Sequence, residues 1–118
     1  ILIKENHLKG SSVTSAVEKV RRLLQKQMEI EVEVTNLEEV KEALEAKADM
    51  ILLDNFSEED TREAVQLIGT QAKIEFSGGV NLSNVRTIAE MGVDRISVGQ
   101  LTHSAPNFDF SLLVKEVY

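Results

Sequence analysis

The sequence contains no cysteine, and aromatic residues make up only 4% of it. The lack of cysteine excludes disulfide frameworks and thiolate metal sites. Carboxylates are then the plausible ligands of any metal, and they favour a hard cation such as Mg²⁺. The low aromatic content argues against a surface on which nucleic-acid bases stack.

Long apolar runs and basic clusters are also missing. No segment approaches the roughly 18 consecutive apolar residues of a membrane span, and the first residues lack the basic-then-apolar pattern of a signal peptide. The net charge of -7, with no basic cluster, argues against nucleic-acid binding. We therefore expect a soluble, cytoplasmic protein that binds neither nucleic acid nor membrane.

The 118 residues, 42% of them hydrophobic, suffice for one domain with one core. No Pro/Gly-rich linker marks a domain boundary. The chain begins with Ile1 inside an apolar run and without an initiator methionine, so we expect it to be part of a longer polypeptide.

Apolar spacing and capping residues predict amphipathic helices. Their expected starts, in chain order, are Ser11 or Ser12, Asn36, Ser57 and Asn81. The last of these helices is expected to bury Leu82 and to stop at Gly92. Short strands are expected between the helices, at residues 1–4, 30–34, 50–54, 73–77 and 95–98. Strands that alternate with helices across short loops predict an α/β fold with a parallel sheet.

The strands at 30–34, 73–77 and 95–98 alternate apolar and polar side chains. Central strands of a doubly wound sheet are nearly continuous apolar runs, because helices cover both faces. A (β/α) barrel, with helices outside and functional groups in its lumen, explains the alternation. Because five strands cannot close a barrel of about eight, we expect a partial (β/α) barrel. An exposed sheet face is the bland alternative, and a compact flavodoxin-like sheet is the alternative if the chain folds alone.

The candidate site residues stand at the carboxyl ends of the expected strands, where ligands of parallel α/β folds bind. In chain order these residues are Lys4, Glu33, Asp54, Ser77-Gly78-Gly79 and Gly99. Glycine lets the backbone approach an anion while N–H groups point at it, so the glycine turns predict a phosphate ligand. The alternative is that they are ordinary turn glycines.

Two of these groups are carboxylates, Glu33 and Asp54, on neighbouring strands. They suit Mg²⁺ bound with a phosphorylated substrate, or a cationic transition state that fixed carboxylates stabilise. The alternative is that Glu33 pairs with Lys4 and that Asp54 caps the following turn. In either case Lys4 needs a partner or an anionic ligand in the lumen.

The motifs also resemble those of a known family. Ile3-Lys4-Glu5-Asn6-His7, Glu31-Val32-Glu33-Val34, Leu53-Asp54-Asn55, Ser77-Gly78-Gly79-Val80 and Val98-Gly99 through Leu101-Thr102-His103-Ser104 are similar, in order and spacing, to the motifs of quinolinate phosphoribosyltransferases. Each motif is weak alone, but together they are specific and span essentially the whole chain.

The resemblance implies transfer of a phosphoribosyl group from phosphoribosyl pyrophosphate to quinolinate, with decarboxylation. The products would be nicotinate mononucleotide, CO₂ and pyrophosphate, in NAD biosynthesis. Mg²⁺ is the implied cofactor, and the full-length protein would be a homodimer or higher homo-oligomer. Lys4 would contact the quinolinate carboxylates, and Glu33 and Asp54 would bind the ribose and magnesium side of phosphoribosyl pyrophosphate. The implied phosphate ligands are Ser77, Gly78, Gly79, Gly99 and His103.

This chain departs from the family by what it lacks. Family members carry an N-terminal domain and early barrel segments that supply arginines, one of them from a partner subunit. Here the arginines fall on expected helices or, for Arg95, low on a strand. We therefore expect residues 1–118 to be the C-terminal part of an α/β-barrel catalytic domain that does not catalyse the reaction alone. Another phosphate-binding barrel enzyme and a non-catalytic βα scaffold are the competing hypotheses.

Overall fold

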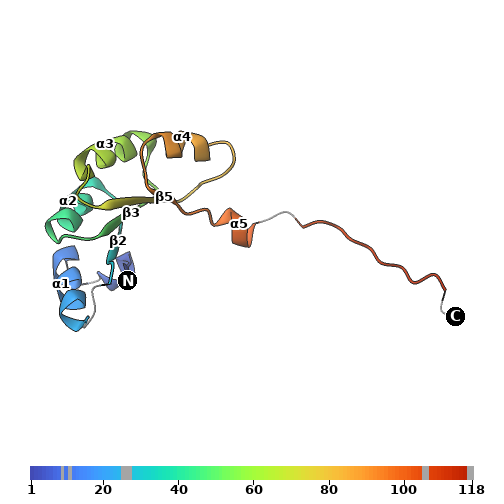
Figure 1. The fold of residues 1–118 in the computed structure, drawn as a ribbon, viewed down its shortest axis with the longest axis horizontal. Coiled ribbons are helices and arrows are strands. Elements are labelled where there is room, and N and C mark those ends of the chain that lie inside the picture. The colour runs from blue at the N-terminus through green and yellow to red at the C-terminus, as the bar shows by residue number, and fades with distance from the viewer. Residues whose placement is uncertain (9, 11, 25–27, 105–106, 117–118) are drawn as a thin grey trace.

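The computed structural model describes residues 1–8, 10, 12–24, 28–104 and 107–116, and Figure 1 shows its strands alternating with helices. The strands are β1 (Leu2–Ile3), β2 (Glu31–Val34), β3 (Met50–Asp54), β4 (Lys73–Ser77) and β5 (Arg95–Ile96). The helices are α1 (Val13–Leu23), α2 (Leu37–Glu45), α3 (Glu58–Ile68), α4 (Val85–Glu90), α5 (Gln100–His103) and the short 3₁₀ helix η1 (Glu5–His7).

The strands form one parallel sheet in the order β1-β2-β3-β4-β5. A flavodoxin-like sheet has the order 2-1-3-4-5, with helices on both faces. Here the order follows the chain, and α1 to α4 lie along one face (Figure 1). The described residues therefore form part of a barrel wall, as the sequence predicts, and the flavodoxin-like alternative is wrong.

The core lies between the sheet and these helices, because successive side chains of a strand point to opposite faces. The strand residues in it are Val32, Val34, Ile51, Leu53, Ile74 and Phe76, and all are buried. Helices α1, α2, α3 and α4 contribute Val17, Val40, Ile68 and Ile88. The intervening strand residues, Glu31 and Glu33 among them, face the other side, where helices α1 to α4 do not lie. Among the described helices, none combines the length and hydrophobicity that crossing a membrane requires.

Most helix starts were predicted correctly, since Ser12, Asn36 and Ser57 each cap a helix through the side-chain oxygen. The other candidate for the first start, Ser11, lies outside the described residues. The start expected after Asn81 is wrong. Asn81 Oδ1 accepts from the Ser83 N–H at 2.9 Å. This bond closes a turn, and α4 therefore begins only at Val85. Leu82 is consequently 97% exposed rather than buried.

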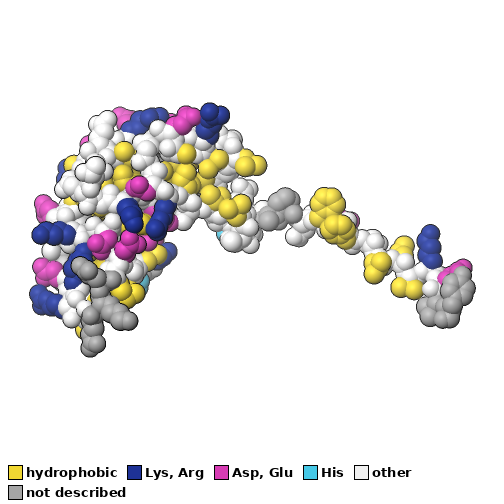
Figure 2. All heavy atoms as spheres, in the orientation of Figure 1, with side chains coloured by type: hydrophobic (Ala, Val, Ile, Leu, Met, Phe, Trp, Pro, Cys, Tyr) yellow, Lys and Arg dark blue, Asp and Glu magenta, His cyan; other side chains and the backbone are white. Residues whose placement is uncertain are grey.

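The two outer strands are shorter than predicted, and two helices next to them, η1 and α5, were not predicted. After β5 the chain turns at once into α5, because the N–H of Leu101 bonds the Val98 carbonyl at 3.2 Å. Residues 107–116 then extend away without helix or strand (Figure 1). Figure 2 shows exposed hydrophobic side chains along this segment, Phe108 and Phe110 among them.

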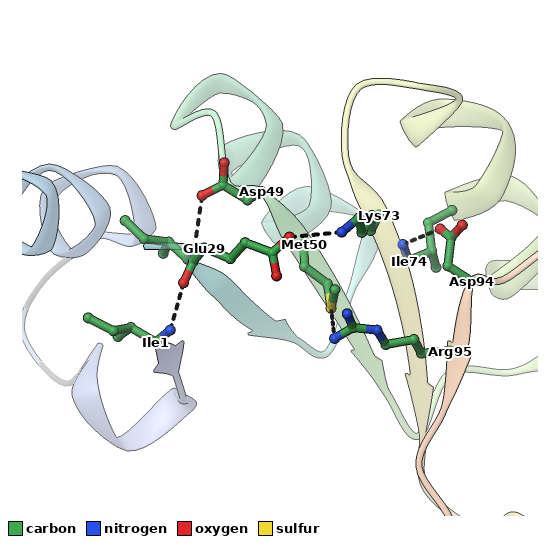
Figure 3. A network of polar contacts seen from close by, with 9 residues as sticks. Ile1, Glu29, Asp49, Met50, Lys73, Ile74, Asp94 and Arg95 are labelled. Atoms are coloured by element: carbon green, nitrogen blue, oxygen red, sulfur yellow. Dashed lines mark hydrogen bonds and ion pairs between the residues drawn. The ribbon is translucent and has the colours of Figure 1, made fainter. Parts of the chain in front are cut away.

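Two aspartates fix the amino ends of the strands in the same way (Figure 3). Asp49 Oδ2 accepts from the Ile30 N–H at 2.8 Å, and the Ile30 carbonyl accepts from the Asp49 N–H at 2.9 Å. Asp94 and Ile74 form the same reciprocal pair at the same two distances. Between them Lys73 Nζ donates to Glu29 Oε1 at 2.8 Å, which lowers the pKa of the exposed Glu29. The side chains at the amino ends of the strands therefore stabilise the fold, and we call this the structural end of the sheet.

Replacing Asp94 with alanine should destabilise the fold by about 1–2 kcal/mol, because the N–H of the buried Ile74 loses its acceptor. Asp94→Asn is the matched control, since it keeps a side-chain oxygen in the same place. Urea denaturation followed by circular dichroism measures both changes. Equal midpoints for the wild type and Asp94→Ala would show that the pair does not stabilise the sheet.

Candidate functional site

At the opposite end of the sheet, the residues predicted to bind phosphate line a single cavity of about 580 Å³. Its lining comprises Ser77, Gly78, Gly79, Gly99 and His103, together with Val80, Asn81, Ser97, Gln100 and Ser104. The loops after β4 and β5 supply these groups, because neighbouring parallel strands end at the same edge. The structure thus brings the Ser77-Gly78-Gly79 turn together with Gly99 and His103, which follow the next strand.

The loop after β4 presents backbone donors. Gly79 has a φ of 62°, and a Cβ added to it would meet nothing within 4 Å. Its carbonyl accepts from Asn81 Nδ2 at 3.1 Å and from Asn84 Nδ2 at 3.0 Å. Since the peptide is trans, the Val80 N–H points the opposite way. Among the described residues, no acceptor bonds the N–H of Gly79 or Val80, so both suit an anion.

The other two glycines are needed for close packing. A Cβ on Gly78 would lie 2.6 Å from Asn55 Cγ, so the loop passes directly against the end of β3. A Cβ on Gly99 would lie 2.6 Å from His103 Nε2. Gly99 therefore lets the imidazole rest on the backbone, while His103 Nδ1 lies 2.7 Å from Ser104 Oγ. Steric need thus accounts for Gly78 and Gly99, and open space for a ligand is found at Gly79.

Lys4, Glu33 and Asp54 lie on the uncovered face of the sheet, outside the lining of the cavity. Lys4 Nζ is 3.2 Å from Glu33 Oε2, with side-chain exposures of 54% and 15%. Asp54 pairs in register with Ser77, and its Oδ2 accepts from Asn55 Nδ2 at 2.9 Å. The ion pair of the structural alternative is therefore present. It uses one oxygen of Glu33, and the Asn55 bond uses one oxygen of Asp54.

The same face carries polar groups outside the candidate site residues, and the sequence interpretation took one of them, Glu31, as a structural or rim charge. Ser97 Oγ donates to Glu75 Oε1 at 2.5 Å. Glu75 lies nearer the amino end of β4 than Ser77, which pairs with Asp54. Glu31 Oε1 is buried and has no hydrogen-bond partner among the described residues. Burial raises the pKa of Glu31, and the Glu75 carboxylate raises it further, while Arg95 acts in the opposite sense. The period-two alternation of β4 and β5 was the signal for Glu75 and Ser97.

None of the arginines lines the cavity. Arg21 pairs with Asp49, Arg22 with Glu18 and Arg86 with Glu90, all at the helical surface. Arg95 Nη1 lies 3.6 Å from Met50 Sδ, at the structural end of the sheet (Figure 3). Within the described residues, Lys4 is the cation that forms an ion pair with one of the candidate carboxylates, Glu33. Among these residues, no group of three or more His, Asp or Glu side chains is placed to hold a metal ion.

A parallel sheet in chain order, covered by helices on one face, is the architecture of the α/β-barrel class. The family model described as quinolinate phosphoribosyl transferase, C-terminal domain, matches residues 1–113. The chain belongs to this family.

Named relatives agree with this assignment. The probable nicotinate-nucleotide pyrophosphorylase (carboxylating) of Methanocaldococcus jannaschii is 43% identical, over 95% of this chain and 42% of the relative. The human nicotinate-nucleotide pyrophosphorylase (carboxylating) is 37% identical, over 99% of this chain and 41% of the relative. The crystal structure of the Ehrlichia chaffeensis nicotinate-nucleotide pyrophosphorylase has a TM-score of 0.84 and 42% identity, covering 88% of this chain and 38% of that one. This chain spans about two fifths of the length of such relatives.

Replacing Gly79 with asparagine should weaken the binding of inorganic phosphate or pyrophosphate by about tenfold or more. Asparagine tolerates the left-handed backbone, but its side chain fills the open space at the loop. Gly10→Asn is the matched control, because Gly10 also has a positive φ and open surroundings. Isothermal titration calorimetry measures the affinity. Equal affinities for both variants would refute the anion site.

Replacing Glu31 with glutamine should stabilise the chain at pH 7 by less than about 1 kcal/mol, since the side chain is partly exposed. A carboxyl whose pKa is raised on folding binds more protons in the folded state, so the wild type loses stability as the pH rises from the unfolded to the folded pKa. The advantage of the variant should therefore vanish below about pH 4. Urea midpoints between pH 4 and 8 test this, with the exposed Glu63→Gln as control. A constant difference across this range would contradict it.

Proposed function

We propose that the whole protein transfers the phosphoribosyl group of phosphoribosyl pyrophosphate to quinolinate, with decarboxylation to nicotinate mononucleotide. Carbon dioxide and pyrophosphate are the other products, and the reaction serves NAD biosynthesis. The observation that carries the proposal is the rim cavity with its glycine loops, found in a chain of this family. The relatives are named nicotinate-nucleotide pyrophosphorylase (carboxylating), which describes this reaction in the reverse direction.

In this proposal, the rim binds the phosphate of the phosphoribosyl group. Gly79 and Val80 offer backbone N–H donors, and His103 and Ser77 offer side chains at the same cavity. Glu33 and Asp54 lie on the adjacent strands and bind the ribose side. When the bond between ribose and pyrophosphate breaks, positive charge develops on the ribose, and fixed carboxylates stabilise it. Glu33 and Asp54 fit this role because they lie at the carboxyl ends of neighbouring strands.

The donor set also suits Mg²⁺, although no larger acidic cluster exists among the described residues. Mg²⁺ usually takes one or two protein carboxylates and completes its shell with phosphate oxygens and water. Glu33 and Asp54 each keep one oxygen outside the Lys4 and Asn55 contacts. We propose that these residues hold the ion. When bound, it would neutralise negative charge on the pyrophosphate.

Recognition of quinolinate needs more than this chain offers. Two carboxylates in a desolvated pocket call for bidentate arginine as well as a lysine point charge. Lys4 is suited to one of them, and the arginines of the chain lie on helices or at the other end of the sheet. We propose that regions matching the remaining length of the relatives supply the other cations, in a cytoplasmic homo-oligomer. The chain alone should then bind phosphoribosyl pyrophosphate without turnover.

The test is calorimetry of the 118-residue chain with phosphoribosyl pyrophosphate and Mg²⁺. Asp54→Asn and Glu33→Gln should each weaken binding by about 10-fold or more, the range expected when a charged hydrogen-bonding group is lost. Glu63→Gln on α3 is the control, and it should leave the affinity unchanged. Wild-type affinity in both test variants would refute the proposed roles of the carboxylates.

A further inference from the structure

We infer that Asn55 is a positioning residue: its side-chain amide fixes the orientation of the Asp54 carboxylate at the rim. This inference rests on the proposed function, because the proposed function is what assigns Asp54 a ligand. The first observation is the backbone of Asn55, whose φ of 55° lies in the left-handed region. Asparagine is among the few residues with a side chain that adopt this conformation routinely. The left-handed conformation therefore costs little free energy at Asn55, as it would at a glycine.

Three contacts hold Asn55 in place. Its backbone N–H donates to the Ser77 carbonyl at 2.9 Å, which ties the end of β3 to the end of β4. Its Nδ2 donates to Asp54 Oδ2 at 2.9 Å. Its Oδ1 is the atom that lies nearest to the position of a Cβ on Gly78. The amide is therefore packed against the glycine loop at its oxygen and bonded to Asp54 at its nitrogen.

The bond to Asp54 gives the amide one orientation, because a carboxylate only accepts. With the oxygen against Gly78, the NH₂ group is the end that faces Asp54, and an NH₂ group only donates. One oxygen of Asp54 is thereby fixed by a donor, and the carboxylate loses rotational freedom before a ligand arrives. Preorganisation of this kind lowers the entropy that binding must remove. Gly78 serves this arrangement, since any side chain there would displace the amide.

The inference predicts which Asn55 variants matter. Asn55→Gly keeps the left-handed backbone and the Ser77 bond but removes the amide. Asn55→Asp keeps the shape but places a second carboxylate beside Asp54. Both should unfold within about 1 kcal/mol of the wild type, and both should bind phosphoribosyl pyrophosphate with Mg²⁺ about tenfold more weakly. Inorganic phosphate should bind Asn55→Gly as it binds the wild type, because the Gly79 loop keeps its anchors.

A double-mutant cycle separates positioning from general structural support. If Asn55 acts through Asp54, Asn55→Gly should have no further effect on phosphoribosyl pyrophosphate affinity in an Asp54→Asn background. A role in supporting the loop would instead give additive losses. Calorimetry of the four proteins measures the coupling, with thermal unfolding as the check that all are folded. Additive losses, or a Gly variant with wild-type affinity, would overturn the inference.

A second readout needs no substrate, so it distinguishes failure of this inference from failure of the proposed function. In NMR spectra of the chain, the side-chain NH₂ resonances of Asn55 should shift on Asp54→Asn. They should also exchange with water more slowly than those of Asn107, which is exposed like Asn55 but has no hydrogen-bond partner among the described residues. Unchanged resonances and equal exchange would overturn the inference. If the resonances shift but the wild type binds no phosphoribosyl pyrophosphate, the hydrogen bond is upheld and the proposed function fails.

Discussion

The alternation of side chains across the parallel sheet determines where every candidate site residue lies. Helices α1 to α4 cover one face, so the apolar residues of β2 and β4 must point to it. The residues between them, Glu31, Glu33 and Glu75, are then forced onto the other face. Register adds the second constraint. It places Asp54 beside Ser77, and so joins a carboxylate to the loop that offers backbone donors.

The two ends of the sheet also differ in which of their hydrogen-bonding groups are already used. At the amino ends, Asp49 and Asp94 satisfy backbone groups of neighbouring strands and leave little that is free to bind a ligand. At the carboxyl ends, the backbone donors at Gly79 and Val80 are not used within the described residues. Under the proposed function, stability and binding are thus separated along the strand direction, as is usual in barrel folds. A change at one end should affect the other only through the core.

Prediction from the sequence succeeded where the signal was local and repeated. The caps at Asn36 and Ser57 and the alternation in β2 depend on neighbours within a few positions. The start of α4 failed because Asn81 and Ser83 bond each other in a turn that competes with a helical start. The contact of Asn55 with Gly78 was not predictable either. It joins two loops through space, so no pattern within either loop indicates it.

The charge of the uncovered face explains why this chain depends on further groups under the proposed function. Glu31, Glu33, Asp54 and Glu75 lie there, and the cations of this face among the described residues are Lys4, Lys73 and Arg95. Lys4 is already paired with Glu33, and burial and the Glu75 carboxylate raise the pKa of the partly exposed Glu31. Phosphoribosyl pyrophosphate and quinolinate are both anions, so this face attracts them only where donors and cations outweigh the carboxylates. Backbone donors do so at the Gly79 loop, and Mg²⁺ would do so beside Glu33 and Asp54. The quinolinate carboxylates, by contrast, need cations from outside residues 1–118.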